Sequence, residues 1–412
     1  MSQPAIKNEW QESTLGTIAE INPRESLKKS ITAKAIAMDR LLPFTRKIAG
    51  YETKAFTGGT KFRNGDTLLA RITPCLENGK TAYVDVLDED EVGFGSTEFI
   101  VIREKHNFSD KKFLYYFAVS PTFREAAIRS MTGTSGRQRV QTDLIANKAF
   151  NFPSAPEQKA IGAILSILDD KIELLQNQNR VLEAIAQKLF HEWFVEFNFP
   201  NADGEMVDSL VGKIPKGWNV GWLGDIVDVK GGTTPSTKNP DFWGGDIAWT
   251  SPKDLSENKE IFLHRTGSKI TELGLTQVSS GLLPLGTILL SSRAPIGYVA
   301  ISSIPVAINQ GYIAVLPRED YPNLFMFLWV KEHMNKIISA SNGSTFLEIS
   351  KSSFKRIEIV KPPEDVVAAF MKIVAPIFKK IAKNEAQQST LKTMKNSLLP
   401  QLVRGDIRVK AF

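Results

Sequence analysis

One long helix is predicted between Glu157 and Phe197, in the sequence EQKAIGAILSILDDKIELLQNQNRVLEAIAQKLFHEWFVEF. The segment has no proline, and Gly162 is its one glycine. About 40 helical residues that rise 1.5 Å each span about 60 Å. Such a helix is longer than a small globular domain needs, so we expect the rest of the chain to be organised around it.

Apolar side chains form one stripe along this predicted helix. The steps between them alternate between four and three residues, which is the seam of a coiled coil, and polar Asn179 occupies one seam position. The apolar members of the stripe are Leu168, Ile172, Leu175, Leu182, Ala186, Leu189 and Trp193. By itself the stripe indicates an extended helix for dimerisation or for packing within the chain.

The composition indicates an ordinary globular protein of two or three domains. The chain has 412 residues, of which 42% are hydrophobic and 23% are charged. Its runs of apolar residues are too short for a membrane span, and its first ten residues do not resemble a secretory signal. The single cysteine, Cys75, excludes an intramolecular disulfide and fits a reducing compartment. We therefore expect a cytoplasmic protein with no membrane partner, and a net charge of +6 permits a polyanionic ligand.

The remaining chain alternates between β-rich and helical regions. The first part has short β-like runs at Thr67–Ala70, Ala82–Val86 and Phe99–Ile102, followed by a helical patch from Lys111 to Met131. A second long helix is predicted from Glu364 to Val403, with a kink or broken turn at Pro376. The predicted boundaries place a first domain at 1–155, a helix at 156–197, a linker and second domain at 198–362, and a second helix at 363–412.

The two halves of the chain repeat each other. Trp10, Leu15, Gly16 and Ile18 recur as Trp218, Leu223, Gly224 and Ile226, an offset of 208 (218 minus 10). Gly65, Leu68 and Leu69 recur as Gly286, Leu289 and Leu290, an offset of 221 (286 minus 65). Leu114, Phe117, Gly133 and Pro153 recur as Leu324, Phe327, Gly343 and Pro363, an offset of 210 (324 minus 114). At that last offset the first long helix aligns with the second.

This repeat predicts an α+β fold with two β-rich α/β domains separated by two long antiparallel coiled-coil helices. A duplicated object of this kind has pseudo-two-fold character. It suits a ligand with two sites in opposite orientation, and duplex DNA is the obvious candidate. A purely structural scaffold or adaptor is the alternative.

The second half carries four motifs whose combination is specific to one family. They are Gly231-Gly232-Thr233-Thr234-Pro235-Ser236, Trp249-Thr250-Ser251-Pro252-Lys253-Asp254-Leu255, Ser291-Ser292-Arg293-Ala294-Pro295-Ile296-Gly297 and Asn309-Gln310-Gly311-Tyr312. Pro156-Glu157-Gln158 opens the first helix, and Leu398-Leu399-Pro400-Gln401-Leu402-Val403 closes the second. With these motifs the whole chain resembles a DNA specificity subunit of a type I restriction-modification system. The first half departs from the pattern, with Ala70-Arg71-Ile72-Thr73-Pro74 in place of the Ser-Ser-Arg-Ala run.

The resemblance implies a non-catalytic subunit that binds double-stranded DNA through two target recognition domains. Each domain would recognise one half of a split, asymmetric target. The long helices would hold the domains apart and dock two modification subunits, which methylate adenine at N6, and restriction subunits would join the full complex. The chain itself would need no cofactor, since the methyltransferase binds S-adenosylmethionine and the restriction subunit binds ATP and Mg²⁺.

The residues independently favour the absence of catalysis. Asn239-Pro240-Asp241-Phe242 is the nearest string to the methyltransferase motif Asn/Asp-Pro-Pro-Tyr/Phe, but its third residue is Asp. Pro240-Asp241 with Glu257-Asn258-Lys259 forms a loose nuclease-like pattern that could hold Mg²⁺. The four histidines, His106, His191, His264 and His333, lack metal-ligand spacing, so no metal site is predicted. A self-contained nuclease or methyltransferase therefore remains an alternative.

We expect the DNA contacts among polar loop residues, because Lys, Arg and small hydroxyl side chains suit phosphates, while Arg, Asn, Gln and Lys suit bases. In the first half they are Lys61, Arg63, Arg71, Lys80, Thr134, Ser135, Arg137, Gln138 and Arg139. In the second half they are Thr233, Thr234, Lys238, Lys253, Arg293, Ser344 and Thr345. Motifs shared by members with different targets, Ser291–Arg293 and Asn309–Gly311, favour structural or backbone roles. The candidate contacts with the methyltransferase are His191, Trp193, Phe194, Leu398, Leu399 and Leu402.

Overall fold

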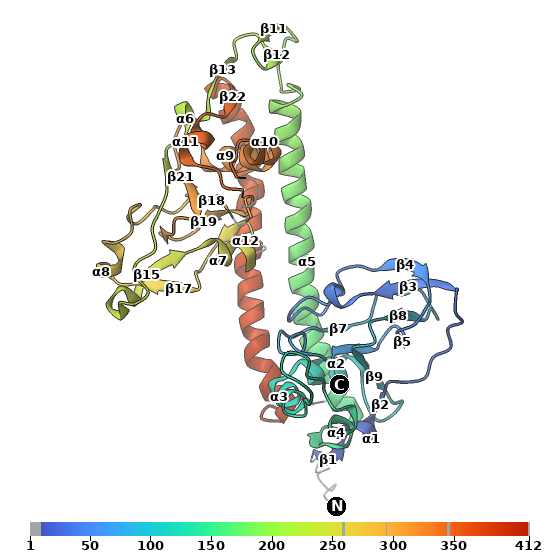
Figure 1. Cartoon of the computed structure of the whole chain (residues 1–412). Coiled ribbons are helices and arrows are strands. Elements are labelled where there is room, and N and C mark those ends of the chain that lie inside the picture. The colour runs from blue at the N-terminus through green and yellow to red at the C-terminus, as the bar shows by residue number, and fades with distance from the viewer. Residues whose placement is uncertain (1–9, 258–259, 294, 344–346, 411–412) are drawn as a thin grey trace, which may run out of the picture. The chain divides into compact units, whose positions relative to one another are not determined.

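The computed structural model describes residues 10–257, 260–293, 295–343 and 347–410. The chain forms two compact units (Figure 1). Unit 1 comprises the residues up to Leu174 together with those from Gln388 onward, and unit 2 runs from Leu175 to Gln387. Two long helices, α5 (Ala155–Phe194) and α12 (Glu364–Arg404), each contribute to both units. The domain boundaries predicted from the sequence, after residues 155, 197 and 362, stay a prediction.

Unit 1 contains two four-stranded sheets. One has the order β2-β9-β6-β7 and the other has the order β4-β3-β8-β5, in which β3 and β8 are parallel. Strand β6 is the apolar run Thr67–Ala70, and all four of its residues are buried, as expected for a central strand covered on both faces. The bounds are β1 Gln11–Thr14, α1 Leu15–Ile18, β2 Ala19–Ile21, β3 Thr32–Ile36, η1 Met38–Arg40, β4 Glu52–Ala55, β5 Thr60–Phe62, β7 Thr81–Tyr83, β8 Gly93–Gly95, β9 Phe99–Glu104, α2 Lys111–Val119, α3 Pro121–Arg129, α4 Thr142–Asn147 and β10 Ala149–Phe152.

Unit 2 contains a five-stranded and a three-stranded sheet. Their orders are β14-β21-β18-β19-β16 and β17-β15-β20, and β15 and β20 are parallel. The bounds are β11 Met206–Ser209, β12 Gly212–Pro215, β13 Asn219–Trp222, α6 Leu223–Ile226, β14 Val229–Lys230, η2 Pro240–Phe242, β15 Trp243–Thr250, α7 Pro252–Glu257, β16 Phe262–Leu263, β17 Ser268–Ile270, α8 Glu272–Leu275, β18 Ile288–Ser291, β19 Val299–Ser302, β20 Ala307–Ile308, β21 Tyr312–Val315, α9 Asn323–Glu332, α10 Met334–Ser339, α11 Lys351–Lys355 and β22 Glu358–Lys361.

The strand orders confirm the internal repeat. The order β2-β9-β6-β7 of unit 1 corresponds to β14-β21-β18-β19 of unit 2, and β4-β3-β8 corresponds to β17-β15-β20. The small ribbon β1–β10 likewise corresponds to β13–β22. Unit 2 adds β16 at one sheet edge, and unit 1 adds β5. The predicted α+β class with two β-rich α/β repeats is therefore correct.

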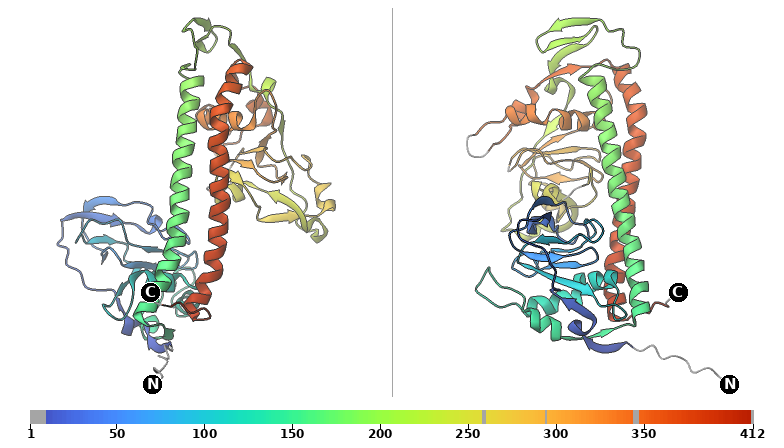
Figure 2. Two further views of the ribbon diagram at one scale, coloured as in Figure 1. Left: turned by 180° about the vertical axis from the view of Figure 1, so that it is seen from behind. Right: turned by 90° about the vertical axis from the view of Figure 1, so that its right-hand side faces the viewer.

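Within each unit, its portions of α5 and α12 run antiparallel. In unit 1, Glu157 pairs with Arg408, which lies just beyond α12, and Asp169 pairs with Lys395. In unit 2, Asn179 bonds Asn384, whereas Phe190, further along α5, contacts the earlier residue Phe370 of α12. The two portions of unit 2 lie side by side in both views of Figure 2. Every predicted seam position is buried or half-buried, which confirms the stripe.

The ends and interiors of the helices differ from expectation in three places. Helix α5 stops at Phe194 rather than Phe197, because Phe197 adopts a positive φ of 61° and its ring packs on Trp218. The patch from Lys111 to Met131 divides into α2 and α3, because Ser120 caps the second helix and Pro121 begins it. The broken turn expected at Pro376 is wrong: α12 continues through this exposed residue while Val374 and Phe378 are buried beside it.

Two large apolar cores support the units. In unit 1 the helices α2 and α3 pack on the sheet β2-β9-β6-β7 and on the α5 portion. In unit 2 the core joins the sheet to α9 and to both long-helix portions, and aromatic side chains of these helices meet in tilted and edge-to-face contacts. Among the described residues, no helix has the length and apolar character needed to cross a membrane.

Candidate nucleic-acid interface

A loop of residues 132–139 is pinned at its base to the end of β6 in unit 1. Thr132 and Arg139 exchange two backbone hydrogen bonds of 3.0 and 2.9 Å, and Arg139 also forms a bridge with Ile72. The Val140 amide donates to the Arg71 carbonyl at 2.8 Å. These bonds fix the base of the loop, while its tip is free of the sheet.

The same base occurs in unit 2. Asn342 and Glu348 exchange two backbone bonds of 2.9 Å each, and Glu348 bridges Arg293 at the end of β18. The Ile349 amide donates to the Ser292 carbonyl at 3.0 Å. Ile72 and Arg293 are 221 residues apart (293 minus 72), which is the offset expected from sequence for this block. The two units therefore present one loop each from the same place in the fold.

The tip of the 132–139 loop is the most open part of the candidate set in unit 1. Thr134, Ser135 and Arg137 are exposed, and the Arg137 side chain makes no hydrogen bond or ion pair with the described residues. Gly133 and Gly136 take positive φ angles of 128° and 78°, which suit glycine and turn the chain back on itself. Gln138 is half-buried, and its carbonyl accepts from the Thr73 amide. The tip thus offers a guanidinium and two hydroxyls to a ligand.

The other cations predicted in unit 1 are held by the domain itself. Arg139 donates to both oxygens of Glu98, and this guanidinium holds the pKa of the Glu98 carboxyl below its usual value. Arg71 lies 3.9 Å from the same carboxylate. Arg63 donates to Glu25 at 2.7 Å. Two lysines use backbone carbonyls: Lys61 bonds Glu25 and Lys80 bonds Met38.

In unit 2 several of the predicted residues are likewise held by contacts within the unit. Thr233 donates to the Gln277 carbonyl at 2.6 Å, and Thr234 donates to the Gln310 side chain at 2.7 Å. Arg293 lies 3.6 Å from Glu348. Lys238 and Lys253 are exposed. Ser344 and Thr345 lie outside the described residues.

The motifs that carry the resemblance interlock around β15 and β21. Asp254 accepts from the Ser251 amide and from the Thr250 hydroxyl, and Tyr312 donates to the Ser251 carbonyl at 2.6 Å. The Ser291 hydroxyl accepts from the Gly297 and Tyr298 amides. These side chains are engaged in shaping the loops, which supports the structural role expected for shared motifs. Gln310, which was not predicted as a DNA contact, lies beside the predicted contacts because its side chain accepts a hydrogen bond from Thr234.

The nearest string to a catalytic motif has a local structural role. Pro240–Phe242 forms the short helix η2, and Asn239 caps it because its side chain accepts from the Asp241 amide at 3.0 Å. The Asp241 carbonyl accepts from the Thr271 hydroxyl. Of the loose nuclease pattern, the Glu257 side chain and residues 258–259 lie outside the described part of the chain.

Four candidate partner contacts are buried, which corrects the expectation that they are available on the surface. Trp193 and Phe194 pack against Phe370, and Phe194 also contacts Trp218. Leu399 and Leu402 lie in the core of unit 1. His191 is half-buried and bonds Glu332 at 2.8 Å, and Leu398 is also half-buried. These packing roles could not be predicted from the sequence, because an amphipathic pattern shows which face of a helix is apolar but not which residues cover that face.

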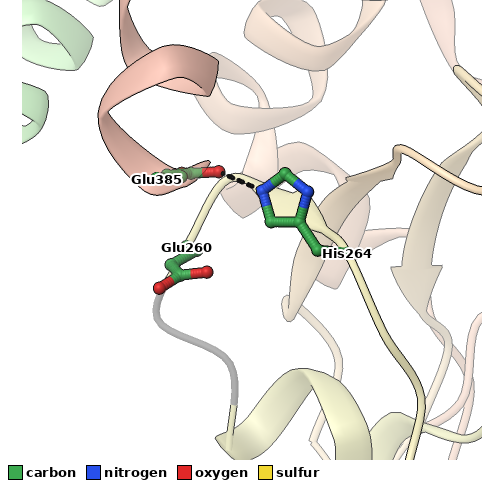
Figure 3. A group of neighbouring side chains, drawn as sticks. All are labelled: Glu260, His264 and Glu385. Carbon is green, nitrogen blue, oxygen red and sulfur yellow. Dashed lines mark hydrogen bonds and ion pairs between the residues drawn. The ribbon is translucent and has the colours of Figure 1, made fainter. Parts of the chain in front are cut away.

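Tertiary structure also brings together three residues that could hold a metal ion, where the sequence predicted none. Glu260, His264 and Glu385 each offer one ligand atom, and these atoms lie within 4.8 Å of one another (Figure 3). Glu385 comes from α12, 121 residues beyond His264. A separation of this size gives no local spacing pattern in the sequence.

Comparison with known proteins identifies the family. The family described as "Type I restriction modification DNA specificity domain" matches residues 7–184 and 215–393. The HindI specificity subunit of Haemophilus influenzae is 28% identical over 406 residues, covering 84% of this chain and 87% of that protein. The MjaIX specificity subunit of Methanocaldococcus jannaschii is 43% identical over 164 residues, covering 39% of this chain and 38% of that protein.

A solved structure supports the fold. The S subunit of a type I restriction-modification system from M. genitalium has a TM-score of 0.59 and 16% identity, covering 97% of this chain and 98% of that one. Two matches of the family domain, in the two repeats, span most of the sequence. The chain therefore belongs to the type I restriction-modification DNA specificity family, whose members are non-catalytic subunits that recognise DNA.

Proposed function

We propose that the chain recognises a bipartite, asymmetric DNA target, with one half-site bound by each β-rich repeat. The observation that carries this proposal is the duplicated loop base: Ile72, Thr132 and Arg139 in unit 1 correspond to Arg293, Asn342 and Glu348 in unit 2. Each repeat thus presents its own loop from an equivalent scaffold. Because the loop sequences differ, each repeat would contact a different base sequence.

The 132–139 loop supplies the sharpest test of base recognition. Arg137 is exposed at the tip, whereas Arg139 is committed to Glu98. Arg137→Ala should weaken binding of the first half-site by roughly 5- to 150-fold, the equivalent of about 1–3 kcal/mol for a good base contact. Arg129→Ala is the matched control, because this arginine is 83% exposed on α3 of the same unit.

The measurement uses the chain mixed with its modification subunit and fluorescent duplexes that alter one half-site at a time. A phosphate contact at Arg137 would instead weaken all sequences alike and lower the salt slope by about 0.9. Equal binding by wild type and Arg137→Ala at the first half-site would contradict a role for this loop.

Domain exchange tests the modular proposal as a whole. Replacing residues 1–155 by the equivalent part of a relative should change one methylated half-site and leave the other unchanged. The positions of methylated adenines in DNA from cells that carry the system provide the measurement. A change in both half-sites would contradict the assignment of one half-site to each repeat.

We further propose that exposed apolar residues of α5 dock two methyltransferase subunits. Ile167 and Leu174 are 65% and 50% exposed in unit 1, and Val181 and Ile185 are 57% and 45% exposed in unit 2. These side chains replace the buried Trp193, Phe194, Leu399 and Leu402 in the proposed contact surface. Exposed apolar side chains on one helix are the type of surface that a partner covers.

Serine substitutions test this surface. Ile167→Ser with Leu174→Ser, or Val181→Ser with Ile185→Ser, should reduce co-purification of the modification subunit without lowering the melting temperature. Leu285→Ser is the control, because Leu285 is 64% exposed in a loop of unit 2. The partner enzymes would supply the chemistry: the modification subunits would bind S-adenosylmethionine, and restriction subunits that join them would bind ATP and Mg²⁺. Unchanged co-purification would remove α5 from the docking surface.

A further inference from the structure

The group Glu260, His264 and Glu385 joins the edge strand β16 to helix α12 within unit 2. His264 directly follows β16, Glu260 precedes it, and Glu385 approaches from the helix (Figure 3). The Glu385 side chain is 2% exposed, so a charged group has been buried at this junction. A buried carboxylate is costly unless donors or a cation compensate it.

The hydrogen bonds around His264 determine which ring nitrogen is available. The Ser303 hydroxyl donates to the Leu263 carbonyl at 2.9 Å, so its oxygen accepts from Nδ1 of His264 at 2.8 Å. Nδ1 therefore carries a proton. The other nitrogen, Nε2, faces Oε2 of Glu385 at 3.0 Å, where its lone pair can take up a proton or a metal ion.

Backbone donors orient the Glu385 carboxylate. Its Oε1 accepts from the Ile261 amide at 2.8 Å, and its Oε2 accepts from the Phe262 amide at 3.3 Å. Each carboxylate oxygen has two acceptor positions, so these bonds leave capacity for a cation. A histidine whose second nitrogen is fixed by a hydrogen bond, beside an oriented carboxylate, is the usual arrangement around a protein-bound metal.

We propose that Glu260, His264 and Glu385 form a Zn²⁺ site that fastens the β16 edge of the second repeat to α12. One imidazole nitrogen and two carboxylate oxygens suit a borderline ion such as Zn²⁺, whereas Mg²⁺ and Ca²⁺ prefer oxygen ligands throughout. A tetrahedral ion with bonds of about 2 Å holds its ligand atoms about 3.3 Å apart. The observed limit of 4.8 Å is within reach of a side-chain adjustment at Glu260.

The test measures Zn²⁺ binding by the intact, chelator-treated chain in competition with a chromogenic chelator. Wild type should bind one equivalent, and the melting temperature should rise with Zn²⁺ but not with Mg²⁺. His264→Gln and Glu260→Gln should each weaken Zn²⁺ binding at least tenfold. His106→Gln, which changes an exposed histidine of unit 1, should leave binding unchanged.

Two further measurements keep the proposal falsifiable if a variant is unstable. Glu260→Gln leaves the His264–Glu385 contact in place, so the variant should still fold without Zn²⁺, and its melting temperature should no longer rise when Zn²⁺ is added. Ser303→Ala removes the acceptor for Nδ1 and should weaken Zn²⁺ binding by about 10- to 100-fold. The proposal is overturned if wild type binds no Zn²⁺, or if folded His264→Gln or Glu260→Gln binds it as tightly as wild type.

Discussion

The glycine pair of the first shared motif gives a sharp prediction about stability in unit 2. Gly232 is the second residue after β14 and is buried, and a Cβ atom at this position would lie 1.8 Å from the Ile308 carbonyl oxygen. Gly231 differs, because its nearest neighbours are side-chain atoms of Lys351 at 3.3–3.4 Å. Gly232→Ala and Gly231→Ala therefore add the same methyl group to adjacent residues in different surroundings.

The size of the expected stability loss depends on whether the clashing atoms can move apart. An ordinary contact begins near 3.4 Å, so Gly232→Ala requires a displacement of about 1.6 Å between two backbone segments. Ile308 pairs with Thr250 in the parallel β15–β20 ladder, and that ladder resists the movement. Overpacking typically lowers the free energy of unfolding by about 1–3 kcal/mol. Because both atoms in this clash are attached to backbone that cannot easily move, we expect a loss of about 3 kcal/mol for Gly232→Ala. Gly231→Ala should change the free energy of unfolding by less than about 0.5 kcal/mol, because the lysine end can move away.

Tryptophan fluorescence during urea or thermal unfolding provides the assay, since six of the seven tryptophans lie in unit 2. For about 200 residues, a loss of about 3 kcal/mol lowers the melting temperature by about 6–12 °C. Binding of the second half-site should weaken with this loss of stability, while binding of the first half-site by unit 1 should be unchanged. Equal stability of the two variants, within about 0.5 kcal/mol, would refute the explanation of Gly232 as a close-approach residue.

Three further predictions concern the helices. Asn179→Leu and Asn384→Leu should each cost about 1–3 kcal/mol, because each removes the 2.8 Å hydrogen bond between the two amides; in the first variant Asn384 keeps only its longer bond of 3.4 Å to Gln178. The double variant should recover about 0.5–3 kcal/mol in a double-mutant cycle by urea denaturation, and additive losses would contradict the pairing. Leu402→Ala should destabilise unit 1 by about 2–5 kcal/mol in thermal unfolding, since this leucine is 2% exposed. Unchanged stability together with weaker binding of the methyltransferase subunit would instead indicate that Leu402 contacts that subunit. The hydrogen bond that the His191 ring donates to the Glu332 carboxylate raises the pKa of His191. The stabilising effect of this pair is therefore complete below the unfolded pKa of about 6.5 and is lost as pH rises through the folded pKa. His191→Gln should flatten the corresponding slope of stability against pH, and an unaltered slope would exclude this pair as its source.

The Asn179–Asn384 pair gives the seam between the two helices a polar centre. Asn179 is the polar member of the predicted seam, and the structure supplies its partner, the buried Asn384. A polar pair at one seam position favours one alignment over shifted ones, at a cost in stability.

Much of the architecture follows from the sequence alone. The three-and-four spacing determines the seam of α5, because helical geometry returns those positions to one side. The ordered matches at constant offsets determine the repeat, since duplicated domains keep their glycines and core residues. The exposed loop of residues 132–139 is also evident from its Gly/Ser/Arg composition, which favours turns over packed structure.

Only the tertiary structure decided which side chains are free to act. Arg139 and Arg137 are two residues apart and chemically identical, yet one is bound by Glu98 and the other is exposed. Trp193 and Phe194 are core residues because Phe370 arrives from a distant helix, and Glu385 reaches His264 in the same way. Periodicity states which face of a segment is apolar, but the partner that covers that face or pairs with a charge is chosen by contacts between residues far apart in the chain.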